Sequence, residues 1–334
     1  MKLRVFLAGL VAAAVSLPAL VQGQGAAAQG PAADFPSRPI RIVVPYPAGG
    51  ATDFVARLMA DRLSKRWGQP FIVENRTGAS GAVGAGEAAR AAPDGYTWLV
   101  TIGDALINNQ ILLKDLPYKP EKDFAFVAQI VHSPAILTAS SKLGVKNMNE
   151  FRERAQRDVG KLSYGSWGVG SLGHLAGEAL NTALKADMVH IPQRGEAAVM
   201  GDILSNTLSV GLTSAGTAKQ HILAGNVAPL AIMGPERVPG MDDIPTIREL
   251  GFNDPIFDAA VWIGVLTPAG VPQLILDKIE AAVRDVFQQP DVKTALLDRG
   301  LMATGTSSAE FRDIYDRESK VILGRMRDLN IQEQ

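Results

Sequence analysis

The chain has no cysteine among its 334 residues. Disulfide bonds, thiolate metal ligands and cysteine nucleophiles are therefore excluded together. An oxidising compartment is not excluded, because roughly 300 residues bury enough apolar surface to fold without covalent cross-links. A chain this long also exceeds what one hydrophobic core usually serves, so we expect two domains.

The sequence also lacks a surplus of either charge. Lys and Arg number 33 against 34 Asp and Glu, for a formal net charge of -1 at pH 7. Nucleic acid binding needs clustered cations that replace counterions, whereas the basic residues here are interspersed with acidic ones. We expect no nucleic acid partner, and an anionic ligand would have to be held by local dipoles.

Recognisable metal and catalytic patterns are absent as well. The four histidines are His132, His174, His190 and His221. None has the i, i+4 spacing of a helical metal site, and no serine stands in a Gly-x-Ser-x-Gly elbow. We expect no metal, no cofactor and no enzyme activity, although an active site assembled from residues distant in sequence stays open.

The N-terminal residues 1–28 have the pattern of an export signal. Lys2 and Arg4 supply the charged start, an apolar run covers 5–21, and Ala26–Ala28 offers a small-residue cleavage site. The apolar run is short for a membrane span. We expect this segment to be a signal peptide.

Short strand patterns alternate with helical patterns through most of the chain. This alternation indicates βαβ units, with mainly parallel sheets and helices on both faces, so the expected fold class is α/β. The expected strands are 40–44, 71–73, 98–100, 161–164, 188–191, 208–212 and 228–233. The segment 272–330 is expected to be helical only, with an apolar stripe that begins at Leu274.

Two longer apolar stretches, 124–139 and 259–266, break the rhythm. If both cross between domains, residues 34–132 and 260–334 form one lobe and 133–259 form the other. Ligands of open α/β sheets bind beyond the carboxyl ends of the strands. Two such lobes that face one another would therefore enclose a ligand cleft.

Two glycine-rich turns each follow an expected strand and lead into a helix. We name Pro45–Asp53 the first turn and Gly165–His174 the second turn. At a helix N-terminus several N–H groups lack partners, and the peptide dipoles leave roughly half a positive charge. Two such ends would clamp an anion between them.

The second turn also spells Gly-x-Gly-x-x-Gly from Gly168 to Gly173, the spacing of a dinucleotide-binding loop. The next expected strand ends in Pro192–Arg194, with no carboxylate placed for a ribose. We therefore interpret these glycines as permitting close backbone approach to a smaller anion.

A series of motifs runs in order through the expected mature chain. They are Pro36–Ile40, Pro45–Asp53, Asn75–Gly81, Pro93–Thr97, Leu116–Tyr118, Gly165–Leu175, Trp262–Gly264 and Thr267–Pro272. Together they resemble the solute-binding receptors of tripartite tricarboxylate transporters, the Bug-type periplasmic receptors. The resemblance implies a two-lobe periplasmic binding protein, type II-like, with two crossover strands and a cleft. It would act as a monomer that captures a small carboxylate and delivers it to membrane permease subunits.

In that family the loops corresponding to 46–52 and 165–171 hold the carboxylate largely through backbone donors and ordered water. The candidate ligand-binding residues are Tyr46, Ala48, Gly49, Gly50, Ala51, Thr52, Asp53, Asp104, Gly165, Ser166, Trp167, Gly168, Gly170, Ser171, His174 and Arg194. The ligand is expected to be a dicarboxylate, an amino acid or an aromatic acid. A sensor for a membrane signalling partner and an exported enzyme are the alternatives, because fold does not separate these functions.

Several of these side chains have two interpretations. Thr52 and Asp53 either cap the helix or contact the ligand, and Trp167 either lies over the ligand or covers the lobe surface. Asp104 stands where family members often carry a small hydroxyl residue. If it faces the cleft it disfavours a second carboxylate and favours an amino, amide or hydroxyl group, and a solvated turn aspartate is the alternative. Gln193 replaces the family's usual aromatic, which leaves the ligand's identity open.

Overall fold

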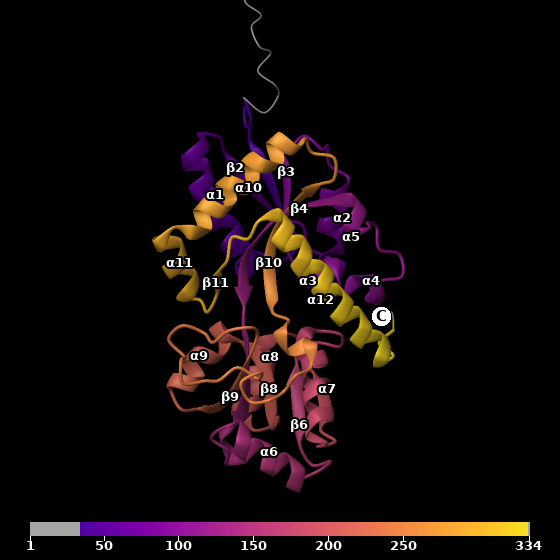
Figure 1. Cartoon of the computed structure of the whole chain (residues 1–334), viewed down its shortest axis with the longest axis vertical. Coiled ribbons are helices and arrows are strands. Elements are labelled where there is room, and N and C mark those ends of the chain that lie inside the picture. Colours follow the sequence, from indigo (N-terminus) through magenta and orange to yellow (C-terminus); the bar gives the residue numbers. More distant parts are fainter. Residues whose placement is uncertain (1–33, 333–334) are drawn as a thin grey trace, which may run out of the picture.

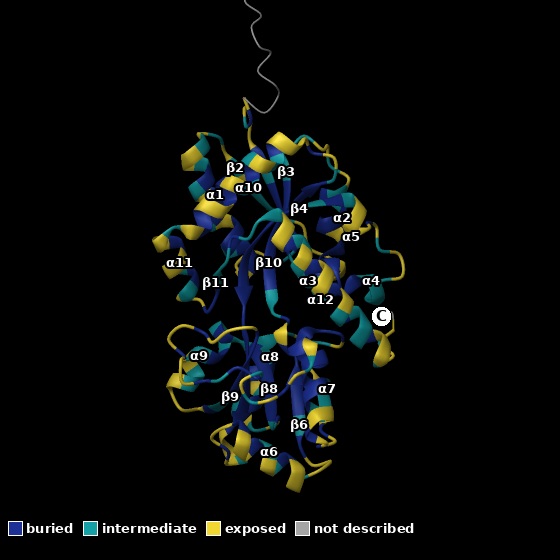
Figure 2. Ribbon diagram, in the orientation of Figure 1, coloured by how far each residue is buried: buried dark blue, intermediate teal, exposed yellow. Residues whose placement is uncertain are grey.

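The structure is a computed structural model that describes residues 34–332, and the expected export signal lies outside the described residues. Two lobes lie one above the other along the long axis, with extended strands running between them (Figure 1). Each lobe is built on one sheet, six-stranded in the first lobe and five-stranded in the second lobe. Buried residues fill the sheets and the inner faces of the helices, whereas the outer faces are exposed (Figure 2).

The six-stranded sheet has the order β11-β4-β10-β3-β1-β2. Its strands are β1 (Ile40–Val44), β2 (Phe71–Asn75), β3 (Thr97–Ile102), β4 (Phe124–Ser133), β10 (Val261–Pro268) and β11 (Met302–Ala303). Strand β1 is parallel to β2 and β3, so all three end at the edge that faces the second lobe. Strand β10 is antiparallel to both β3 and β4.

The five-stranded sheet has the order β7-β6-β8-β5-β9. Its strands are β5 (Ala135–Ser140), β6 (Ser163–Ser166), β7 (Val189–Pro192), β8 (Val210–Ser214) and β9 (Val227–Met233). Strand β6 is parallel to β7 and β8, whereas β5 is antiparallel to β8 and β9. The carboxyl ends of β6 and β8 therefore point toward the first lobe (Figure 1).

Helices cover both sheets. They are α1 (Ala51–Trp67), α2 (Ala82–Ala89), α3 (Gly103–Leu106), α4 (Asn109–Leu112), α5 (Pro120–Asp123), α6 (Met148–Arg157), α7 (Leu172–Leu184), α8 (Glu196–Ser205), α9 (Ala215–Leu223), α10 (Gln273–Gln288), α11 (Pro290–Leu297) and α12 (Ser308–Asp328). Helix α1 buries Val55, Met59 and Leu63, which lie four residues apart and so share one face. Among the described residues, no helix is both long enough and apolar enough to cross a bilayer.

The apolar stretch 124–139 forms two strands in different sheets. Strand β4 ends at Ser133 and β5 begins at Ala135. Pro134 lies between them, where its missing N–H removes one ladder hydrogen bond. The return path leads from β9 through the 3-10 turn Pro255–Asp258 into β10. The chain therefore passes twice between the sheets at this boundary.

Three sequence expectations about the fold are wrong. The sheets are mixed and not mainly parallel, because β10 and β5 run opposite to the parallel strands of their sheets, and each pairs antiparallel on both of its sides. The segment 272–330 contains the short strand β11, which β4 recruits as an antiparallel edge partner. Leu274 is 68% exposed, because the buried stripe of α10 begins one residue later at Ile275.

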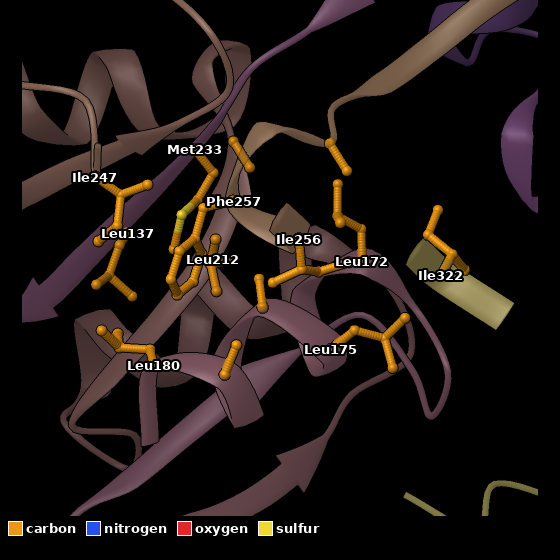
Figure 3. Close-up of a cluster of buried hydrophobic side chains, with 14 of the residues drawn as sticks. Leu137, Leu172, Leu175, Leu180, Leu212, Met233, Ile247, Ile256, Phe257 and Ile322 are labelled. Carbon is orange, nitrogen blue, oxygen red and sulfur yellow. The ribbon is translucent and has the colours of Figure 1, made fainter. Parts of the chain in front are cut away.

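Contacts tie the two lobes together on both sides. On one side α12 extends from the first lobe onto α7, and its Ile322 belongs to the same apolar cluster as Leu172 and Leu175 (Figure 3). On the other side, a Cβ added to Gly216 at the start of α9 would lie 2.2 Å from the Arg299 carbonyl oxygen. The lobes therefore touch backbone to backbone at that point.

Candidate ligand-binding site

The first turn leaves backbone donors without a protein acceptor. It follows β1, and its residues from Pro47 to Ala51 are exposed. Gly50 is the N-cap of α1, with φ -74° and ψ 172°, and no side chain caps this helix. Within the described part of the chain, the N–H groups of Gly50, Ala51 and Thr52 have no assigned acceptor. Their dipoles favour an anion at this end of α1.

Asp53 holds the first turn in shape. Its carboxylate accepts the Gly49 N–H at 2.9 Å, Arg57 Nε at 3.0 Å and Asn75 Nδ2 at 2.9 Å. Asn75 also donates to the Tyr46 carbonyl at 3.0 Å. The hydrogen bond from Arg57, with those from Gly49 and Asn75, lowers the pKa of Asp53 to about 2 despite its burial. Asp53 is therefore charged, buried and fully engaged with the protein, and the Gly49 N–H is occupied.

The second turn is closed by its own hydrogen bonds. The Gly168 N–H donates to Ser166 Oγ at 3.3 Å, and the Gly170 N–H donates to His174 Nδ1 at 3.1 Å. The Ser171 N–H donates to the Gly168 carbonyl at 3.3 Å. Ser171 Oγ caps α7 by accepting the His174 N–H at 3.3 Å. The expectation of free amides at Gly168 and Gly170 is wrong, because this turn carries its own acceptors.

Fewer donors remain at the start of α7. Among the described residues no acceptor is assigned to the N–H groups of Leu172 and Gly173. The Trp167 ring covers Gly173 so closely that an added Cβ would lie 2.7 Å from Trp167 Cζ3. Gly165 also serves packing, since a Cβ there would lie 2.4 Å from Leu208 Cδ1 in the lobe core. Packing contacts thus explain the large side chain at Trp167 and the absence of a side chain at Gly165.

Two histidines brace the second turn. The rings of His174 and His190 stack with their centroids 3.9 Å apart. Ser166 Oγ lies 2.8 Å from His190 Nε2. Burial, with the neighbouring His174, lowers the pKa of His190 to about 4, and burial also lowers the pKa of His174. Both rings are therefore neutral at pH 7, and they hold the second turn in place through hydrogen bonds.

Asp104 lies between the two turns. It is the second residue of α3 and lines a small cavity with Asn108 and with Leu172, the first residue of α7. Its charge also raises the pKa of Tyr46, after the larger effect of burial. Burial raises the pKa of Asp104 itself to about 6, and no hydrogen bond or ion pair to another described residue is assigned to it. Asp104 is thus a half-buried carboxyl group at the boundary of the lobes.

The segment from α3 to α4 links the turns. A Cβ added to Gly81 would lie 3.1 Å from Tyr46 Oη and 3.2 Å from Ala105 Cβ, so α3 packs beside the first turn. Asn108 Nδ2 donates to the Gly170 carbonyl of the second turn at 2.9 Å. One short segment therefore borders both turns.

Sequence reasoning overlooked some polar groups at this boundary. Asn108 and Asn109 are 3% and 1% exposed, and each has a buried Oδ1 without a protein partner among the described residues. Thr213 Oγ1, near the carboxyl end of β8, is likewise buried and unpartnered. The available signal was the Asn108–Asn109 pair in an otherwise apolar stretch after β3. Thr213 had no such signal.

The remaining candidate ligand-binding residues have fewer interactions with the rest of the protein. Ala48 and Ala51 are exposed in the first turn, and Thr52 is 7% exposed, with no side-chain partner assigned to it among the residues that the structure describes. Arg194 is exposed between β7 and α8, and no described residue forms an assigned ion pair with it. Within residues 34–332 no cluster of three or more potential metal-ligating side chains occurs.

Two α/β lobes joined by crossing strands, with helix N-termini at their boundary, define the class of two-lobe solute-binding proteins. A family model described as "Tripartite tricarboxylate transporter family receptor" matches residues 55–323, and the chain belongs to this receptor family. The family expected from the sequence motifs and the α/β two-lobe fold class are therefore confirmed.

Individual relatives agree with this assignment. Protein BugT of Bordetella pertussis is 31% identical over 277 residues, covering 83% of this chain and 84% of BugT. The solved periplasmic binding protein BugD is 28% identical with a TM-score of 0.71, over 90% of this chain and 100% of BugD. MatC from Rhodopseudomonas palustris, solved with bound malate, is 31% identical with a TM-score of 0.68, over 86% of this chain and 100% of MatC.

Proposed function

We propose that this protein is a periplasmic receptor that captures a small carboxylate between its lobes and delivers it, as a monomer, to membrane permease subunits. The observation that carries the proposal is the exposed end of α1, where the Gly50, Ala51 and Thr52 N–H groups have no assigned acceptor within residues 34–332. The family and the malate bound by the relative MatC support a carboxylate as the ligand. We expect the ligand to be released chemically unchanged, because binding alone accounts for the free N–H donors of the first turn.

The donors of the first turn are sufficient for useful affinity. A hydrogen bond to a charged acceptor contributes about 1.5 to 3 kcal/mol. Three such bonds, less the cost of immobilising the ligand, correspond to a dissociation constant on the order of micromolar. Calorimetric titration with mono-, di- and tricarboxylates tests this, followed by NMR of the recovered ligand. Absence of saturable binding by every acid, or recovery of a converted product, would refute the proposal.

Asp104 narrows the class of ligand. A half-buried carboxyl group between the turns disfavours a second carboxylate nearby and accepts hydrogen bonds from an ammonium or hydroxyl group. We therefore propose an amino or hydroxy acid over a plain symmetrical dicarboxylate. Malate, the ligand in MatC, carries a hydroxyl group.

Aspartate, malate and succinate test this specificity because they share one carbon skeleton. We expect wild type to bind aspartate or malate about 10-fold or more tightly than succinate, and Asp104→Ser to reduce that ratio severalfold. Thr97→Ser, far from both turns at the other end of β3, is the control and keeps the wild-type ratio. An unchanged ratio in Asp104→Ser would remove Asp104 from the site.

Closure of the lobes is the conformational step that we propose. The lobes, residues 34–132 with 260–334 and residues 133–259, would close about the two crossing strands because the ligand touches both only when they are shut. The contact of Gly216 with Arg299 and Gly300 leaves no room for a Cβ. We expect Gly216→Ala to hold the lobes apart and to weaken ligand binding about 10-fold.

Small-angle scattering with and without ligand measures closure in that variant. Gly201→Ala in α8 is the matched control, because a Cβ at Gly201 meets no atom within 4 Å. Compaction by ligand in wild type and Gly201→Ala, with none in Gly216→Ala, supports the closure. Equal compaction in all three would contradict it.

A further inference from the structure

A cavity of about 570 Å³ lies at the crossing between the lobes, and we name it the hinge cavity. Both crossing strands contribute to its wall, β4 with Gln129 and His132 and β10 with Trp262. Helix α12 provides Glu318 and the loop after β9 provides Glu236. Its volume lies within the range of small-molecule pockets, roughly 300 to 1,000 Å³.

The hinge cavity lies away from both turns, although Ala260, Trp262 and Glu318 line both it and the small cavity at Asp104. None of the candidate residues in the two turns lines it, and Asp104 does not line it either. Its apolar wall includes Pro235, Pro255, Ile314 and Val321. An occupant would therefore meet side chains of both lobes without touching the first turn.

Gln129 gives the cavity an unsatisfied buried acceptor. The residue is 6% exposed, and its side-chain Oε1 is buried without a hydrogen-bond partner among the described residues. Its backbone is already engaged, with the N–H donating to Thr306 Oγ1 at 3.0 Å and the carbonyl accepting from Thr304 Oγ1 at 2.9 Å. A buried polar atom without a partner is costly, so this amide is suited to a bound molecule.

Most charged groups around the cavity are already paired. Arg248 forms a salt bridge with Asp258, and His132 Nε2 lies 3.5 Å from Glu236 Oε1. Glu318 forms no assigned salt bridge within residues 34–332, although the charge of Arg317 favours its ionised form, and its carboxyl accepts the Trp262 indole N–H at 2.7 Å.

Among the described residues that line the cavity, Arg317 is the remaining cation, and its side chain is exposed to solvent. The polar groups that the buried part of the wall offers an occupant are the Gln129 side-chain amide, whose oxygen has no partner among the described residues, and the Glu318 carboxyl. Burial raises the pKa of Glu318 to about 7, and a cation beside it would favour its charged form.

We propose that the hinge cavity is a second binding site that takes a small organic ammonium ion with an apolar body. The ammonium donates to Gln129 Oε1 and to the Glu318 carboxylate, while the apolar body lies against Pro235, Pro255 and Val321. Since both lobes line the cavity, the occupant stabilises the arrangement of lobes seen in this structure.

Butylammonium is the probe, and butanol is its neutral counterpart with the same apolar body. Calorimetry at pH 7.5 should show one butylammonium per chain, bound about 10-fold or more tightly than butanol. Gln129→Leu and Glu318→Gln should each weaken butylammonium binding about 10-fold or more. Gln220→Leu, at an exposed glutamine of α9, is the matched control and should bind as wild type does.

Gly50→Asp separates this site from the carboxylate site. Butylammonium binding that persists in Gly50→Asp and Gln220→Leu but falls in Gln129→Leu and Glu318→Gln supports the hinge cavity. Loss of butylammonium binding in Gly50→Asp would place the probe in the cleft between the turns and overturn the inference. Absence of saturable binding to wild type, or a normal affinity in Gln129→Leu or Glu318→Gln, would overturn it too.

Discussion

In the described part of the chain, the N–H groups of Gly50, Ala51 and Thr52 in the first turn have no assigned acceptor. In the second turn, the Gly168 and Gly170 N–H groups donate to Ser166 and His174. Both turns are glycine-rich and both lead from a strand into a helix. The difference arises from the neighbouring acceptors, because the second turn contains two serines and a histidine within reach of its own backbone. A glycine-rich turn is therefore an anion site only where the surrounding side chains leave its donors free.

The braces of the two turns also differ in charge. Asp53 holds the first turn as a carboxylate that pairs with Arg57, while neutral His174 and His190 hold the second. In the first turn, the ion pair of Asp53 with Arg57 therefore stands next to the free N–H groups of the helix end. Among the described residues, the second turn keeps unpaired N–H groups at the start of α7, at Leu172 and Gly173, while its Gly168 and Gly170 N–H groups are occupied.

The largest expected effect on ligand affinity comes from a substitution that occupies the free N–H groups of the first turn. Gly50 has φ -74°, and a Cβ there would meet only the Pro47 carbonyl oxygen at 3.6 Å, so other residues fit without strain. In Gly50→Asp the new carboxylate caps α1 and occupies its free N–H groups. We expect carboxylate affinity to fall about 100-fold while stability rises by a few tenths of a kcal/mol.

Gly50→Ala is the control for that substitution. It adds a Cβ without a capping group, so calorimetry should show carboxylate affinity within about threefold of wild type. If Gly50→Asp binds carboxylates as wild type does, the first turn is not the anion site, and the contrast between the turns has no functional meaning.

A smaller effect is expected from removing the brace of the first turn. Asp53→Ala takes away the acceptor of Gly49, Arg57 and Asn75 at once. We expect chemical denaturation to show a loss of about 2 kcal/mol in the free energy of unfolding. Asp316→Ala, which breaks the exposed i,i+4 pair with Arg312, should cost less than about 0.5 kcal/mol. Equal losses would mean that Asp53 does not brace the turn.

The smallest effect is a difference in acid sensitivity. The pKa of His190 is lowered to about 4 by burial and by His174, so its contribution is complete above pH 6.5 and declines as the pH falls toward 4. The pKa of Asp53 is lowered to about 2, so its contribution is complete above about pH 4 and declines toward pH 2. Amide NMR should therefore show Gly168 and Gly170 perturbed between pH 6.5 and 4, and Gly49 only below that range.

His190→Gln tests the assignment to histidine. The amide can still pair with Ser166, but it does not titrate. Between pH 7 and 5 wild type should lose about 1 kcal/mol more unfolding free energy than the variant, after allowance for solvent screening. A parallel decline in both proteins would show that the second turn's acid sensitivity has another source.

Part of the site was predictable from the sequence. The positions of both turns followed from strand, glycine and helix signals that lie close together in the chain. The partners of Gly168 and Gly170 were also local, but their choice depended on side-chain directions in the folded turn. Asn108 could not be placed, because its contact with Gly170 joins segments 62 residues apart.

The fold, like the site, was predictable from the sequence only in part. Apolar runs located most strands of both sheets, since burial on a sheet is recorded in each strand's own residues. Strand direction was less accessible, and β11 was missed because its Met302–Ala303 pair is an edge strand only in the presence of β4. The expected signal peptide and the ligand's identity stay predictions.

The sequence by itself determined the family, the α/β class and the places where chain direction turns beside a helix, because these depend on local composition and spacing. The tertiary structure alone decided which amides are free, which carboxyl stands between the turns and where a cavity opens beside the crossing strands. Those properties arise from distances between segments that are remote in sequence, and a periodic pattern does not record them.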